Sequence, residues 1–415
     1  MTFQKDIQYY KFCAYGFFKN LRFFDPFLLL FFYEKGLSFT EIGSLYAVRE
    51  ICINILEVPS GLIADLFGRK RAMILSFASY IISFLLFFIF NSFWGFVLAF
   101  VLYGIGDAFR TGTHKAMILA YLKHNAWAVD KTIYYGRTRS WSQRGSAMAS
   151  LISAGIVFYM GSYEYIFLCS IFPYLIDLLL MVSYPDFLNG ELSAQSGGVA
   201  HLLKQHFKAL KKAFSQWASF RILITTSSYT GFYKAIKDYM QPLLLSLALV
   251  LPFADNLDEK SKGALLIGVI YFIIFLLTSY ISRIAHLIEN KFTNSYKALS
   301  FVQIIGWLGG LVGGVFYMIG WHVMAVVAFT FILLVQNVRR PIAISYVSSS
   351  FDDQIMATVM SAESQSETIF TAFFALGLGL LIDFFGIGMG LSILSAVLIV
   401  FFTIVSFLRN NFKIT

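Results

Sequence analysis

Charged residues interrupt several long apolar stretches of this sequence, at intervals that match the turn of a helix. The first group is Tyr15, Lys19 and Arg22, spaced four and three residues apart, with Asp25 three residues further on. Side chains at such intervals share one face of a helix. Cations and carboxylates gathered on that face could hold an anionic or zwitterionic solute, and a carboxyl among them could bind and release a proton.

Similar groups recur in other apolar stretches. Asp107, Arg110 and His114 lie at intervals of three and four. Glu50, Asn54 and Glu57 share a face, from which Arg49 is expected to project about 100° away. The second half of the chain contributes Tyr233, Lys234, Lys237, Asp238 and Gln241 in one stretch, Gln336, Asn337, Arg339 and Arg340 in the next, and Glu363 and Glu367 in a third. So many ionisable groups in apolar surroundings predict a polar central cavity.

A purely structural role is the alternative for any single pair of these residues. Arg22 with Asp25, Asp107 with Arg110, or Lys234 with Asp238 could each form an ion pair within one helix. Buried ion pairs, however, stabilise a fold poorly compared with apolar packing. The number of such groups therefore favours function.

The composition identifies the elements that must position these side chains. Of the 415 residues, 58% are hydrophobic and only 13% are charged, which is typical of a polytopic membrane protein. Twelve apolar runs are long enough to cross a bilayer, with centres near Leu21, Ile53, Ile82, Asp107, Ser150, Pro173, Ala235, Ile273, Gly309, Leu333, Thr371 and Val397. We therefore predict an all-α membrane protein with twelve transmembrane helices.

The cations in the connections predict the orientation of these helices. Most of them, including Arg69, Lys70 and Arg71, fall in loops that share one side, whereas the opposite loops contain only Lys35, Lys260 and Lys262. By the positive-inside rule both termini are cytoplasmic. The net charge of +9 is then explained by anionic lipid beside the membrane edge, and no nucleic-acid partner is expected.

An internal repeat divides the chain. Gly16-Phe17-Phe18-Lys19 reappears as Gly231-Phe232-Tyr233-Lys234, so we predict two six-helix bundles, at residues 1–185 and 219–415. Residues 186–218 form the predicted linker. Within it, apolar residues spaced three and four apart over 199–214 predict an amphipathic helix on the cytoplasmic membrane face.

The connection from Gly61 to Arg71 contains Gly61, Asp65, Gly68 and Arg69, followed by two more cations. It resembles the signature between helices 2 and 3 of the major facilitator superfamily of secondary transporters. This resemblance implies that these four residues form a conformational gate, with Asp65 facing the N-terminal end of helix 11. It also implies that helices 1, 4, 7 and 10 line the cavity.

The mechanism that follows is alternating access, in which two halves rock about a site near mid-membrane. The expected solute contacts are Tyr15, Lys19, Arg22, Asp25, Asn54, Arg110, Tyr233, Lys234, Lys237 and Gln241. The expected proton-binding groups are Glu50, Asp107, His114 and Asp238. We expect no cofactor and no metal, and a monomer in the cytoplasmic membrane.

Two alternatives compete with a carrier for polar solutes. One is a proton-driven exporter of drugs or amphipathic lipids, which predicts a more apolar cavity; the helix 5 stretch lacks the proline common in drug antiporters. The other is a non-transporting receptor or an intramembrane enzyme. Against the enzyme, no nucleophile elbow, HExxH or paired catalytic aspartate motif is present in the sequence.

Overall fold

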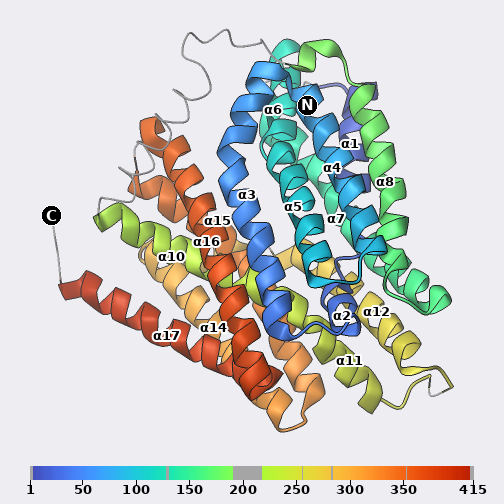
Figure 1. Cartoon of the computed structure of the whole chain (residues 1–415). Coiled ribbons are helices and arrows are strands. Elements are labelled where there is room, and N and C mark those ends of the chain that lie inside the picture. Colours follow the sequence, from blue (N-terminus) through green and yellow to red (C-terminus); the bar gives the residue numbers. More distant parts are fainter. Residues whose placement is uncertain are drawn as a thin grey trace. The chain divides into compact units, whose positions relative to one another are not determined.

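The computed structural model describes residues 3–127, 130–189, 217–254, 256–281, 284–351 and 353–411, and within these ranges the regular structure is helical (Figure 1). The amphipathic helix predicted at 199–214 lies outside the described residues. Two compact units divide the chain. Unit 1 consists of Met1–Phe31, Val48–Gln205 and Asn256–Phe275, and unit 2 of Phe32–Ala47, His206–Asp255 and Leu276–Thr415.

The described residues between Phe3 and Asn189 form eight α-helices and a short 3-10 helix. They are α1 (Ile7–Lys19), α2 (Leu28–Glu34), α3 (Phe39–Phe67), α4 (Arg69–Ile89), α5 (Phe93–Arg110), α6 (Thr113–His124), α7 (Lys131–Met160), α8 (Tyr165–Val182) and η2 (Asp186–Asn189). Side chains at the first turns satisfy free backbone N–H groups. Asp6 accepts from Tyr9 N–H at 2.8 Å ahead of α1, and Ser92 caps α5.

The second half follows with a similar series. It comprises α10 (Trp217–Ile236), η3 (Lys237–Tyr239), α11 (Met240–Val250), α12 (Glu259–Ile281), α13 (Ala285–Glu289), α14 (Ser295–Met318), α15 (His322–Ser350), α16 (Asp353–Phe385) and α17 (Ile387–Asn411). The predicted division into bundles at 1–185 and 219–415 stays a prediction.

Eight helical segments in the described ranges are long and apolar enough to cross a membrane. The other four predicted spans, centred near Leu21, Ile53, Ser150 and Ala235, coincide with helices that are interrupted or rich in charge. Leu21 lies between α1 and α2, and Ala235 lies at the end of α10, just before η3. The apolar runs therefore predicted where the helical segments lie, but not which of these segments are interrupted.

Three of the interruptions fall at the charged groups singled out above. The backbone turns between Lys19 and Leu28, after which α2 begins, and Pro26 lies within this break. Between α5 and α6, Gly112 adopts a φ of +83°, a conformation that favours glycine. Between α10 and α11 lies the 3-10 turn η3. Each interruption therefore places backbone that is not α-helical next to ionisable side chains.

The repeated glycines allow neighbouring helices to approach closely. A Cβ on Gly16 of α1 would lie 3.1 Å from Ser142 Oγ of α7, and one on Gly231 of α10 would lie 2.6 Å from Phe370 Cβ of α16. Gly145 of α7 likewise packs directly against the backbone of α1 at Phe17. In each half the first helix thus meets the fifth predicted span through small residues, as helices in membranes commonly do.

This close approach makes Gly145 a sensitive position. Gly145→Val is expected to push α7 away from α1 and to cost about 1–3 kcal/mol of stability, as overpacking does. Gly155→Val on the same helix is the matched control, because a Cβ there meets nothing within 4 Å. Thermal unfolding of the two purified variants tests the contact; equal melting temperatures would contradict it.

Candidate functional site

A hydrogen-bonded ion pair occupies the break between α5 and α6 in unit 1. Arg110 Nη2 lies 2.6 Å from Asp107 Oδ1, and Tyr80 of α4 donates to the same carboxylate oxygen at 2.6 Å. Arg110 Nε in turn donates to Tyr80 Oη at 3.1 Å. The prediction that Asp107 and Arg110 pair within one helix is confirmed. Asp107 is thus held by two donors in its charged form.

The break between α1 and α2 presents Lys19, Arg22 and Asp25. Arg22 Nη1 and Asp25 Oδ2 lie 3.9 Å apart, as predicted, in a long and weak pair. Lys19 ends α1 and is only 7% exposed, and Tyr174 of α8 donates to its carbonyl at 3.2 Å. Within the described ranges the Lys19 ammonium has no hydrogen-bond or ion-pair partner.

Charged groups of both signs interact with the Lys19 ammonium. It interacts electrostatically with two further cations, Arg22 and Arg110, as well as with the carboxylates of Asp25 and Asp107. Each of these carboxylates is already paired with an arginine. A buried ammonium beside two paired arginines is an environment that favours an anionic ligand.

Aromatic rings enclose His114 at the start of α6. Its ring stacks on Tyr15 with centroids 3.5 Å apart, and its Nε2 lies 3.3 Å from Tyr184 Oη. Both Tyr15 and His114 are buried. The structure therefore brings these two predicted residues together as a packed pair.

On α3 the predicted separation of Arg49 from Glu50 differs from the contact that the structure shows. Arg49 was expected to project away from Glu50, yet Arg49 Nη2 lies 3.1 Å from Glu50 Oε1, and the guanidinium lies 5.7 Å from the centre of the Phe100 ring. Adjacent long side chains can reach each other by bending along the helix surface. Asn54, one turn further on, is half-buried.

The pairing predicted in unit 2 was wrong. Lys234 Nζ lies 3.6 Å from Glu367 Oε2 of α16, and Asp238 pairs instead with its neighbour Lys237, at 3.3 Å. The reason is the 3-10 turn η3, which begins at Lys237 and ends the regular helical spacing between positions 234 and 238. Gln241 is fully buried at the start of α11, and Tyr233 is half-buried.

Arg339 of α15 is the centre of a second polar network. It is 1% exposed and donates to Thr226 O at 2.6 Å, to Gln336 Oε1 at 3.1 Å and to Thr230 Oγ1, while its guanidinium lies over the Tyr229 ring. Three of these partners lie on α10. Arg339 therefore joins two helices predicted to line the cavity.

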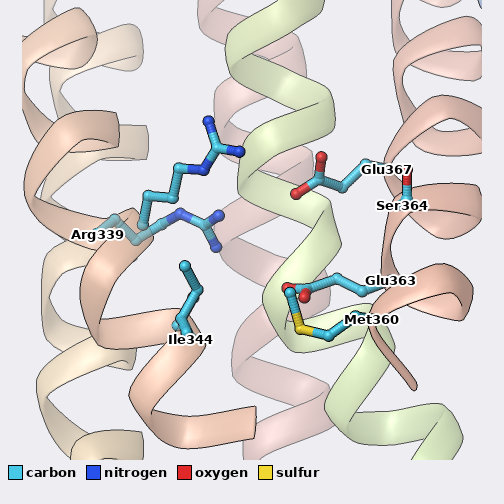
Figure 2. Close-up of a pocket in the computed structure, with 8 residues that line it drawn as sticks. Arg339, Ile344, Met360, Glu363, Ser364 and Glu367 are labelled. Atoms are coloured by element: carbon cyan, nitrogen blue, oxygen red, sulfur yellow. The ribbon is translucent and has the colours of Figure 1, made fainter. Parts of the chain in front are cut away.

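A cavity of about 130 Å³ opens beside this network, between α15 and α16 (Figure 2). Its walls are formed by Arg339, Arg340, Ala343, Ile344, Met360, Glu363, Ser364 and Glu367. Arg339 lies on one helix, and Glu363 and Glu367 lie on the helix opposite (Figure 2). This cavity lies within unit 2 and is lined by charges of both signs.

The residues of the predicted gate lie at the turn between α3 and α4. Arg69 Nη2 lies 3.2 Å from Asp65 Oδ1, and Gly68 has a φ of +103°. A Cβ on Gly61 would meet nothing within 4 Å, so close packing does not require glycine there. The neighbouring Lys70 Nζ contacts Asp186 at 3.1 Å, so in unit 1 the signature forms a local charge network.

Sequence reasoning missed Asp177 of α8. The residue is fully buried, and neither carboxylate oxygen has a hydrogen-bond partner in the part of the chain that is described. The signal was present, because Asp177 is the one acidic or basic residue in an otherwise largely apolar run from Tyr165 to Val182. Asp383 of α16 was also missed; it accepts from the N–H groups of Phe39 and Thr40 at 3.0 and 2.7 Å and caps α3.

Comparisons with known proteins agree with the fold. The chain is 25% identical over 400 residues to an uncharacterized MFS-type transporter, YxaM, of Bacillus subtilis strain 168, covering 94% of this chain and 93% of that protein. It superposes on the crystal structure of the nucleoside transporter NupG with a TM-score of 0.73, at 12% identity, over 98% of this chain and 97% of that one. A POT family transporter in complex with 5-aminolevulinic acid gives a TM-score of 0.68 at 13% identity, with coverage of 98% and 95%.

The model of the Major Facilitator Superfamily matches residues 12–366, which is most of the chain. The fold class, the multi-pass membrane location and the absence of an enzyme signature agree with this match. The protein belongs to the major facilitator superfamily and is a membrane transporter.

Proposed function

We propose that this transporter moves a small anionic or zwitterionic solute across the cytoplasmic membrane by alternating access, coupled to protons. The working arrangement is a monomer of twelve transmembrane helices in two six-helix bundles, with both termini in the cytoplasm. Its relative in Bacillus subtilis supports a cytoplasmic-membrane location. The gate residues are Gly61, Asp65, Gly68 and Arg69.

The observation that carries the proposal is the buried ammonium of Lys19. Burying a charge without a partner is costly, and such groups in membranes mark substrate or ion paths. Arg22 and Arg110 add positive charge around it. A carboxylate or another anionic group of a solute would provide the missing partner, so we assign Lys19 to direct solute binding.

The broken helices support the same assignment. Transporters of this general design form their sites from discontinuous helices, because unwound backbone at membrane depth is tolerated where it lines a cavity. Here the breaks coincide with Lys19 to Asp25, with Arg110, and with Lys237 and Asp238. In the second half we assign Tyr233, Lys234, Lys237 and Gln241 to the solute path, as counterparts of the first.

The polar cavity beside Arg339 argues against the exporter of drugs or amphipathic lipids. An exporter of apolar compounds needs a largely apolar binding surface. The described cavity is instead lined by two arginines and two glutamates. Charged or zwitterionic metabolites fit this chemistry better than uncharged hydrophobic compounds do.

A ligand screen tests the proposal. Purified protein is heated with libraries of anionic, zwitterionic and hydrophobic metabolites, and a true ligand raises the unfolding temperature with concentration. We expect stabilisation by a carboxylate or phosphate compound, followed by its uptake into liposomes under an imposed pH gradient. Stabilisation and flux with uncharged hydrophobic compounds alone would contradict the proposal and support the exporter; binding without counterflow would indicate a receptor.

A further inference from the structure

A buried carboxyl in unit 1 lies near the solute-binding ammonium but does not pair with it. Asp177 is 0% exposed, and neither oxygen accepts a hydrogen bond from any described residue. Lys19 is 7% exposed and equally without a partner there. The two groups interact electrostatically, yet they form none of the ion pairs within 4 Å found among the described residues.

The packing of α8 against α1 brings the two residues into the same region of unit 1. Tyr174, one helical turn before Asp177 on α8, donates to the Lys19 carbonyl at 3.2 Å. Side chains on a helix point back toward its N-terminus, and α1 starts at Ile7 and ends at Lys19. The Lys19 side chain therefore extends back along α1 toward the level of Tyr15, the residue of α1 that also interacts with Asp177.

The groups around Asp177 do little to offset the energetic cost of a buried carboxylate charge. It interacts electrostatically with Lys19 and Tyr15 of α1 and with Tyr184, just beyond the end of α8. The helices α4 and α7 present no charged group to it within the described ranges. A carboxylate with no hydrogen bond in such a place is expensive to keep charged, whereas the neutral acid is not.

We propose that Asp177 binds the coupling proton and that its protonation releases Lys19 to bind an anionic solute. This inference rests on the proposed function and names its proton site. Without the proton, the Asp177 carboxylate pairs with the Lys19 ammonium and competes with the solute. When water delivers a proton to a carboxylate oxygen, Asp177 becomes neutral and the ammonium turns to the solute anion. Proton and solute then bind together, so the coupling is symport.

Asp177 suits this role better than the groups predicted from the sequence. Asp107 is held by Arg110 and Tyr80, Glu50 by Arg49 and Asp238 by Lys237, each within 3.3 Å. Protonating any of them would break an existing ion pair. Protonating Asp177 in the observed arrangement breaks none.

Infrared spectroscopy of the purified full-length protein in lipid nanodiscs tests the protonation directly, without any solute. Wild type at neutral pH should show the C=O stretch of a protonated carboxyl, and Asp177→Asn should remove that band. The matched control is Asp186→Asn, an exposed aspartate paired with Lys70, which should leave the band in place. Absence of the band in wild type, or its persistence in Asp177→Asn, overturns the proposal whether or not the protein transports.

Transport of the compound identified by the screen tests the coupling. A gradient of about one pH unit should sustain about tenfold accumulation in wild type for one proton per solute. In Asp177→Asn we expect equilibrative counterflow to persist and accumulation to fall to about onefold. Full accumulation by Asp177→Asn contradicts the proposal. A carboxyl band at Asp177 in a protein that moves no solute would instead refute the proposed function and leave the proton site standing.

Discussion

Lys19→Met is expected to abolish transport of the solute while leaving the protein folded. Methionine keeps an unbranched side chain in the buried space but removes the ammonium. Losing one partner of a buried charge-assisted contact costs about 2–5 kcal/mol, which corresponds to a loss of solute affinity of about 30-fold to several thousand-fold. Counterflow in liposomes and thermal stabilisation by the same compound measure this loss.

Lys11→Met is the matched control for this variant. Lys11 lies on the same helix but donates to the Ser183 carbonyl at 2.8 Å, and its replacement should leave counterflow close to wild type.

Stability separates the functional role of Lys19 from a structural one. The ammonium has no partner among the described residues, so Lys19→Met leaves no opposite charge newly unpaired. We therefore expect an unfolding temperature equal to that of wild type or higher. A clear fall in melting temperature, together with retained counterflow, would show that Lys19 supports the fold.

The sequence predicted the class of fold well because hydrophobicity and charge act over whole segments. The predicted spans correspond to helices or to adjoining helix pairs, and the basic turn after Asp65 lies where α3 gives way to α4. The repeat of Gly16 and Gly231 also has a physical counterpart, since each glycine allows a close helix contact. Such features depend on local residue types. They can be predicted without knowing how each helix is rotated about its axis relative to its neighbours.

The contacts of the charged residues were harder to predict. Within one helix the intervals decide which side chains meet, and the Asp107–Arg110 pair followed from them. Between helices the partner depends on how each helix is rotated and where it breaks. The turn η3 reassigned Asp238 to Lys237 and left Lys234 to Glu367 on another helix. No interval in the sequence contains that information.

Isolated polar residues were overlooked for a different reason. Groups of charges attracted attention, whereas Asp177 stands alone in an apolar helix. No sequence motif marks Asp177. What indicates a functional role is the free energy needed to bury a carboxyl group in an apolar helix. Arg339 was recognised as polar, but its role as a junction between α15 and α10 required the positions of Thr226 and Thr230.

Arg339→Met is expected to destabilise the protein strongly, by about 3–5 kcal/mol, as the loss of one partner in a buried charged network does. The guanidinium donates to three oxygens and lies 5.6 Å from the centre of the Tyr229 ring. Removing it leaves the Thr226 carbonyl and the Gln336 amide oxygen without these donors in a buried site. It also removes a cation near Glu363 and Glu367.

Arg340→Met is the control that makes this result interpretable. Arg340 is the next residue on α15 and lines the same cavity, but it is exposed, and the described residues provide no hydrogen bond to it. Its replacement should change the free energy of unfolding by no more than about 0.5 kcal/mol, as exposed substitutions usually do. If Arg339→Met unfolds at the same temperature as Arg340→Met and loses counterflow alone, Arg339 serves the solute directly. If both properties fall together, the guanidinium is the structural junction between α10 and α15, and the solute path depends on it through their packing.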